Sequence, residues 1–181
     1  MSVFIALLRG INVGGKNIVP MAELRAALTS AGLQSVKTYI QSGNVVFASR
    51  TSSPAKLQAT IQGTLDKHFD VKPSVMILTS VELEAAISVN PYADRDIQAN
   101  CVHLYFLDAR PAGDAVEAAC TLAASSEEFQ IVGNVFYLFA PDGVARSKLA
   151  SRAERTLGVG ATARNLRSSR KILELAMSIS E

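Results

Sequence analysis

Short apolar segments alternate with amphipathic ones along the first 79 residues. Four segments have the length and apolar content of strands: 3–8, 36–41, 45–48 and 73–78. Residues 20–30 begin with a proline in a helix-starting position, carry Leu24 and Leu28 on one face, and stop at Gly32. Residues 53–69 also predict a helix, because Leu57, Ile61 and Leu65 recur at helical spacing. The order of these elements predicts a βαββαβ unit of the ferredoxin-like type.

A similar order begins again after a helix predicted at 81–89. Its elements are a strand, a helix and a hairpin, at 101–107, 112–123, 129–132 and 135–139. The turn at 132–135 reads Val-Gly-Asn-Val and echoes Ser-Gly-Asn-Val at 42–45, ninety residues earlier. Gly-Asn turns also recur for conformational reasons alone. We favour an internal duplication, in which residues 1–79 and about 98–156 superpose.

The sequence therefore predicts an α+β fold of two ferredoxin-like (βαββαβ-type) subdomains with an internal duplication and a helical C-terminus. The first subdomain is expected at 1–79, a helix and linker at 80–100, and the second subdomain with C-terminal helices at 101–181. We place the linker itself at 90–100 and expect the part of the chain from Ser147 onward to be helical.

Composition narrows the class of protein. With 49% hydrophobic residues in 181, the chain can bury a substantial core. No apolar run approaches the ~18 residues of a membrane-spanning helix, and residues 3–8 are too short for a signal peptide. Cys101 and Cys120 form no disulfide framework and are expected as buried, reduced thiols. We expect a cytoplasmic protein with no membrane partner; the sequence does not indicate its oligomeric state.

The net charge of +2 conceals a strong segregation of charge. Residues 146–171 carry eight basic side chains and one acidic one, and residues 1–79 carry eight and three. Residues 80–145 carry ten acidic and two basic side chains. Such segregation creates local potentials that favour anionic ligands at the basic segments. The alternative is that these cations only solvate exposed helix faces.

The loop after the first predicted strand is the first candidate site. Its sequence, Arg-Gly-Ile-Asn-Val-Gly-Gly-Lys-Asn at 9–17, combines cations and amides with glycines that expose backbone N–H groups to anions. In a βαββαβ sheet the first strand is antiparallel to the third, so this loop should meet the hairpin between the second and third strands. The residues expected to cluster there are Arg9, Asn12, Lys16, Gln41, Ser42 and Asn44. Each asparagine could instead satisfy local backbone groups.

A second candidate set lies near the C-terminus. It comprises Arg146, Ser147, Lys148, Arg164, Asn165 and Arg167. Asn165 is predicted to cap a helix over 166–178 whose cations face away from its apolar side. Arg164, just before that helix, could hold an anion together with the helix dipole.

Catalytic signatures are weak. Residues 10–17 miss a Walker A loop by one residue, because Asn17 stands where Ser or Thr would ligate Mg²⁺. Pro20 also delays the helix that should follow the lysine directly. We expect neither tight binding nor hydrolysis of ATP. The spacing of His and Cys suits no zinc site, and no nucleophile elbow occurs. We nominate no catalytic residue, metal or cofactor.

Four motifs in order resemble a bacterial family known only as domain of unknown function 1697. They lie at 3–17, 39–47, 146–149 and 162–165, and the resemblance extends to about Ala176. The family often has tryptophan after the last asparagine, followed by a threonine-rich turn, whereas this chain has Leu166 and Ser168-Ser169. The resemblance implies a small bacterial protein with paired ferredoxin-like subdomains and no established activity.

Two functions remain open from the sequence. The first is non-catalytic binding of nucleic acid or another polyanion through the basic, amide-rich residues of both sets. The chain has no tryptophan, so base stacking of the RNA-recognition-motif kind lacks support. The alternative is an enzyme or sensor for a phosphorylated or carboxylated metabolite in a cleft between the subdomains.

Overall fold

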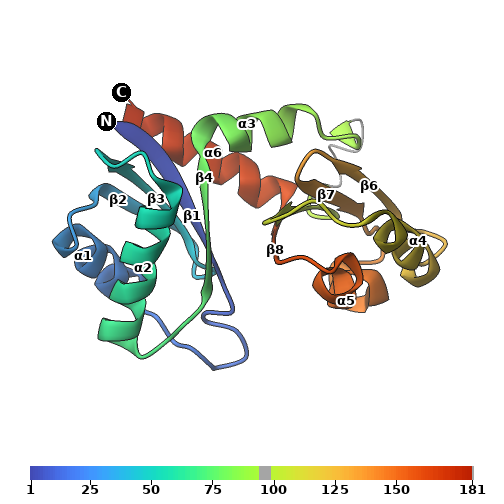
Figure 1. Cartoon of the computed structure of the whole chain (residues 1–181), viewed down its shortest axis with the longest axis horizontal. Coiled ribbons are helices and arrows are strands. Elements are labelled where there is room, and N and C mark those ends of the chain that lie inside the picture. Colours follow the sequence, from blue (N-terminus) through green and yellow to red (C-terminus); the bar gives the residue numbers. More distant parts are fainter. Residues whose placement is uncertain (94–98, 181) are drawn as a thin grey trace. The chain divides into compact units, whose positions relative to one another are not determined.

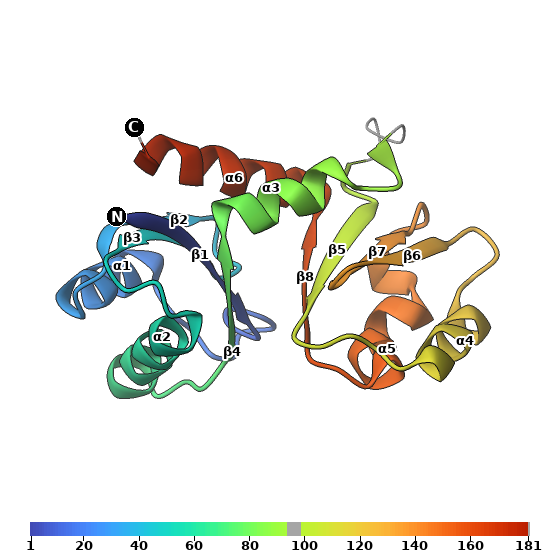
Figure 2. The same ribbon diagram turned by 45° about the horizontal axis from the view of Figure 1, so that its top comes forward.

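The computed structural model describes residues 1–93 and 99–180. They fold into two compact units, residues 1–84 together with 171–181 and residues 85–170. Each unit contains one four-stranded antiparallel sheet with helices against it (Figures 1 and 2). The expected linker at 90–100 falls partly on 94–98, which lie outside the described residues. No described helix combines the length and apolar character needed to cross a membrane.

The first unit has the predicted βαββαβ order. Its elements are β1 (Ser2–Arg9), α1 (Met21–Ser30), β2 (Gln34–Tyr39), β3 (Asn44–Ser49), α2 (Pro54–Phe69) and β4 (Ser74–Thr79). The strands pair in the order β2-β3-β1-β4, all antiparallel. Two expected boundaries shift, because β2 ends at Tyr39 rather than residue 41 and β3 begins at Asn44. Residues 40–43 thus form the hairpin loop.

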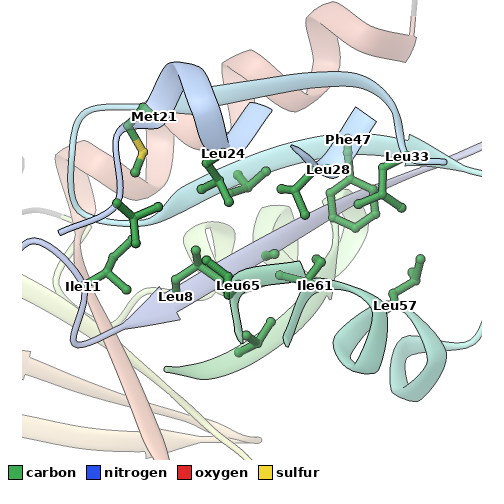
Figure 3. Packing of buried hydrophobic residues seen from close by; sticks show 14 of the residues in the cluster. Leu8, Ile11, Met21, Leu24, Leu28, Leu33, Phe47, Leu57, Ile61 and Leu65 are labelled. Atoms are coloured by element: carbon green, nitrogen blue, oxygen red, sulfur yellow. The ribbon is translucent and has the colours of Figure 1, made fainter. Parts of the chain in front are cut away.

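The core of the first unit lies between its sheet and the helices α1 and α2 (Figure 3). Alternate residues of β1 and β3 face those helices, among them Phe4, Leu8 and Phe47. Leu24 of α1 and Ile61 of α2 pack against them at helical spacing, as the sequence predicts. The start of α2 is fixed by Ser53, whose Oγ accepts a hydrogen bond from the backbone N of Lys56 (3.4 Å).

The opposite face of the first sheet is buried as well. The strand register aligns Lys37, Val46 and Ile5 across this face, and Val46 and Ile5 have no exposed surface. Lys37 Nζ donates to Ser178 Oγ (2.9 Å) on α6 (Leu166–Ser180). The second half of α6 belongs to this unit and covers the face that α1 and α2 leave open (Figure 2).

The second unit repeats the topology. Its elements are β5 (Val102–Leu107), α4 (Gly113–Leu122), β6 (Glu128–Val132), β7 (Val135–Phe139), a 3₁₀ turn η2 (Val144–Arg146), α5 (Lys148–Leu157) and β8 (Ala161–Asn165). The strand order β6-β7-β5-β8 matches that of the first sheet. The predicted α+β fold of two ferredoxin-like subdomains is confirmed.

The expectation that the part from Ser147 onward is helical is wrong at β8. Gly158, in the left-handed region at φ 68°, ends α5. The chain then pairs antiparallel with β5, with Ala161 opposite Leu107 and Asn165 opposite His103. The backbone N of Gly160 also donates to Asp108 Oδ1 (2.9 Å) at the start of this pairing. The fourth strand of the second subdomain therefore lies beyond residue 156, where the expected repeat stopped.

The two hairpins that resemble each other in sequence are offset by one residue in structure. Leu8 N donates to Gly43 O (2.8 Å), and the corresponding bond in the second unit runs from Leu107 N to Asn134 O (2.9 Å). Gly43 thus corresponds to Asn134, not to Gly133. A slip of one residue moves side chains to the other face of a sheet, so the Gly-Asn echo is not an alignment of the two units. Their similarity is carried by strand order instead.

Two helices pass from one unit to the other. The helix α3 (Ser80–Ser88) follows β4, and its residues from Ala85 on belong to the second unit. There Ala86 O accepts a hydrogen bond from Tyr137 Oη (2.7 Å), on the face of the second sheet that α4 and α5 leave open. The helix α6 follows β8 and ends in the first unit. Each compact unit therefore contains part of a helix that directly follows the last strand of the other unit: α6, after β8, for the first unit and α3, after β4, for the second.

The cysteines differ from expectation in one respect. Both are free thiols, but only Cys101 is partly buried. Cys120 is exposed on α4, because the buried positions of that helix are Ala115 and Ala119. In the described part of the chain no group of three His, Cys, Asp or Glu side chains is arranged to hold a metal ion.

Candidate functional site

The loop between β1 and α1 meets the β2–β3 hairpin at one end of the first sheet. β1 and β3 are antiparallel, with Leu7 opposite Asn44, so the end of one lies beside the beginning of the other. Asn12 Nδ2 donates to Gln41 O (2.8 Å), which joins the two loops directly. The proximity expected from topology is confirmed for this pair.

Asn12 fixes the loop through both atoms of its amide. Its Nδ2 also donates to Val19 O (3.0 Å), and its Oδ1 accepts from Val19 N (2.8 Å). The residue itself adopts the left-handed region at φ 52°, which asparagine tolerates better than most residues. These bonds occupy the amide, so Asn12 positions the loop rather than offering its side chain to a ligand.

The tip of the loop is a tight turn at residues 13–16, between Asn12 and Asn17. Lys16 N donates to Val13 O (3.0 Å), and Gly14 and Gly15 both have positive φ, as a type I′ turn requires. Asn17 Nδ2 donates to Gly10 O (2.7 Å), and Asn12 N donates to Asn17 O (3.0 Å). The loop therefore has a defined backbone, and it does not lead directly into a helix as a Walker A lysine does.

Asn44 has a comparable structural use. It is fully buried, and its Nδ2 donates to Tyr39 O (3.1 Å) and Ser42 Oγ (3.0 Å). These bonds close the four-residue hairpin between β2 and β3. Of the six candidates in this unit, Asn12 and Asn44 shape the backbone.

The other four candidates of the first unit are exposed. They form what we call the cationic loop site: Arg9, Lys16, Gln41 and Ser42. Arg9 ends β1, Lys16 lies at the loop tip, and the other two lie in the hairpin loop. Residues 1–65 contain a single acidic side chain, Glu23, whereas Asp66 and Asp70 precede β4, whose Ser74 is opposite Arg9.

Two candidates of the second unit cap helices. Ser147 Oγ accepts from Ala150 N (2.8 Å) at the start of α5. Asn165 Oδ1 accepts from Ser168 N (2.8 Å) at the start of α6, which confirms the predicted N-cap. Arg146, Lys148 and Arg167 are exposed beside these helix starts.

Arg164 lies just before α6, as expected, but within the strand β8. Within β8, Arg164 is paired with Leu104 of β5. It lies on the face of the second sheet that also carries Tyr137. Its Nη1 donates to Ala163 O (2.7 Å), and burial lowers the pKa of its guanidinium to about 10. The side chain stays protonated at neutral pH, but it is set into the sheet and not displayed like Arg167.

The structure thus gathers the candidates into two groups within separate units. The first group is the loop end of the first sheet. In the second unit, β7 and β8 both end where β5 begins, since Phe139 is opposite Val102 and Asn165 opposite His103. The segments 146–148 and 165–167 follow those strand ends, so the topology brings them to one end of the second sheet.

Sequence reasoning did not assign a role to buried His103. It lies in β5, and its Nδ1 is 3.4 Å from Cys101 O. Burial lowers the pKa of the imidazole below its usual 6.5. No spacing signal in the sequence marks this residue, because its environment is made by strands distant in the chain.

His103 makes stability depend on pH. The native imidazole stays neutral where the unfolded one, with pKa 6.5, takes up a proton. The free energy of unfolding should therefore fall as pH drops through 6.5 and level off below the lowered native pKa. Since a single proton is involved, the slope contributed is at most about 1.4 kcal/mol per pH unit. Urea unfolding of the parent and of His103→Gln at pH 7.5, 6.5 and 5.5 checks this; equal slopes for both proteins would contradict it.

Comparisons with known proteins agree with this architecture. A solved structure described as conserved bacterial protein SP0830 from Streptococcus pneumoniae has a TM-score of 0.75 and 26% identity, over 97% of this chain and 98% of that one. Among functionally curated proteins none matches significantly.

The sequence profile of one family matches residues 1–137 and so spans the first βαββαβ set through most of the second sheet. That family is described as "Protein of unknown function (DUF1697)". Because the profile matches three quarters of its length, the chain belongs to the DUF1697 family.

Proposed function

We propose that this protein binds nucleic acid without catalysis, and that the cationic loop site contacts its phosphates. The observation that carries the proposal is the exposure of Lys16 at the tip of a loop whose backbone is fixed by Asn12 and Asn17, with exposed Arg9 at the end of β1 just before that loop. A fixed loop loses little conformational entropy when a ligand binds. Hydrogen bonds from Arg or Lys to phosphate are charge-assisted and therefore among the stronger ones.

The second unit offers further cations for the same ligand class. Arg146, Lys148 and Arg167 are exposed beside the N-termini of α5 and α6. A helix N-terminus carries partial positive charge, which adds to the attraction for phosphate. These residues are a separate phosphate-contacting group within the second unit.

The flat face of either sheet is an unsuitable platform for bases. Ile5 and Val46 of the first sheet and Leu104 and Tyr137 of the second have no exposed surface. Proteins of the RNA-recognition-motif kind stack bases on aromatic residues of an open sheet. Binding at the loops is consistent with the burial of both faces.

The salt dependence of binding tests the proposal. Short single-stranded and duplex RNA and DNA are titrated at several salt concentrations. Log K should fall linearly with log salt, with a slope of about −0.7 to −0.9 for each phosphate neutralised. Arg9→Ala, Lys16→Ala and Arg167→Ala should each reduce the slope by about one contact.

Lys56→Ala is the matched control. Lys56 is also an exposed cation of the first unit, but it lies at the start of α2. That helix follows the C-terminal end of β3, whereas the hairpin precedes the N-terminal end of β3. This variant should retain the parent's slope. No salt-dependent binding to any nucleic acid, together with a saturable rise in melting temperature from a phosphorylated metabolite, would refute the proposal in favour of a metabolite-binding protein.

A further inference from the structure

Three well-exposed aliphatic side chains lie in the same two loops. Val13 is 66% exposed, Ile18 59% and Ile40 52%, and we call them the aliphatic trio. Val13 and Ile18 belong to the loop after β1, and Ile40 to the β2–β3 hairpin. Single exposed aliphatic residues are common, but three at one site call for a reason.

The hydrogen bonds of Asn12 bring the trio to one place. The side chain of Asn12 binds the backbone of Val19 and Gln41 at 2.8 to 3.0 Å. Val13 follows Asn12, Ile18 precedes Val19, and Ile40 precedes Gln41. Each member of the trio is thus the chain neighbour of one of the three residues joined by these bonds.

Ile40 is kept there against its backbone preference. Its φ is 49°, in the left-handed region that branched side chains disfavour by about 1–2 kcal/mol. Burial does not explain why an isoleucine occupies this position, since the residue is 52% exposed. Strained residues that persist without a packing benefit cluster at functional positions.

We infer that the aliphatic trio contacts the bases of a single-stranded nucleic acid while Arg9 and Lys16 hold its phosphates. The inference rests on the proposed function and names its ligand class. Phosphates gain nothing from aliphatic neighbours, whereas base faces are apolar and are accessible in single strands. Aliphatic side chains are known to wedge between bases, so the scarcity of aromatic residues does not exclude this mode.

The test separates base contacts from phosphate contacts. The probe is a single-stranded DNA oligonucleotide containing 2-aminopurine, whose fluorescence reports on base stacking, compared with its duplex and with inorganic polyphosphate. The variant carries Val13→Ser, Ile18→Ser and Ile40→Asn. We expect it to lose about tenfold in affinity for the single strand at every salt concentration, which corresponds to about 1.4 kcal/mol, with an unchanged salt slope. Its effect on 2-aminopurine fluorescence should be largely lost.

Two controls keep the outcomes distinct. Ile40→Asn alone should melt at or above the parent's temperature, because asparagine tolerates the left-handed backbone. A melting temperature of the triple variant close to the parent's excludes unfolding as the cause of its weaker binding. Lys16→Ala should change the slope instead of the fluorescence. Parent-like binding and fluorescence by the triple variant would overturn the inference alone. If log K for Lys16→Ala depends on log salt with the same slope as for the parent, the proposed function itself is overturned.

Discussion

Deleting residues 171–181 is expected to unfold the first sheet, although these residues follow the last strand of the second unit. Ile172 and Ala176 have no exposed surface, and the segment covers the face that carries Ile5 and Val46. Each large aliphatic side chain returned to water costs about 1.5–3 kcal/mol. The total loss, on the order of 5 kcal/mol or more, is comparable with the whole stability of a small domain.

Hydrogen exchange measured by mass spectrometry checks this prediction strand by strand. In the deletion variant, β1 and β3 should lose protection while β5 and β7 retain it. Two point variants on the same segment provide a graded control. Ile172→Ala should lower the free energy of unfolding by about 2–5 kcal/mol, whereas Met177→Ala, at a position 57% exposed, should change it little. Full protection of β1 and β3 after the deletion would show that α6 is dispensable to the first unit.

Local patterns in the sequence predicted most elements of this fold, but not its long-range features. The runs at 3–8 and 45–48 carry enough apolar residues to identify buried strands. β8 has the sequence Ala-Thr-Ala-Arg-Asn, which lacks a run of branched residues, and it becomes a strand by pairing with β5. Since β8 was missed, the position of Arg164 within a sheet was missed with it.

The same distinction applies to the covering helices and the site. The apolar face of α6 is evident from its spacing, but spacing does not indicate which sheet the helix covers. Asn12 and Asn44 were correctly expected near a turn. From the sequence alone, an asparagine in a turn is equally compatible with binding a ligand and with binding the backbone. The structure distinguishes the two roles, because backbone carbonyls lie within 3.1 Å of both side-chain amides. Exposed Arg9 and Lys16 remain the part of the candidate site that can reach a ligand.

Gly43→Ala is expected to be the most damaging single substitution in the two loops of the candidate site. Gly43 has φ 77°, which an L-residue adopts at a cost of about 1–2 kcal/mol. An added Cβ would also lie 2.7 Å from Leu8 Cβ and 2.9 Å from Leu8 O, where overpacking costs about 1–3 kcal/mol more. We therefore expect the free energy of unfolding to fall by about 2–5 kcal/mol.

The second hairpin contains the matched control for this effect. Gly133 is also left-handed, at φ 59°, but a Cβ there would meet no atom within 4 Å. Gly133→Ala should therefore show only the conformational part of the loss, about 1–2 kcal/mol. Urea unfolding followed by circular dichroism compares the two. Equal losses would mean that the hairpin can move away from β1, and then the bond from Leu8 N to Gly43 O would not hold the candidate site together. A larger loss for Gly43→Ala shows that close contact between β1 and this hairpin builds the platform on which Arg9, Gln41 and Ser42 are displayed.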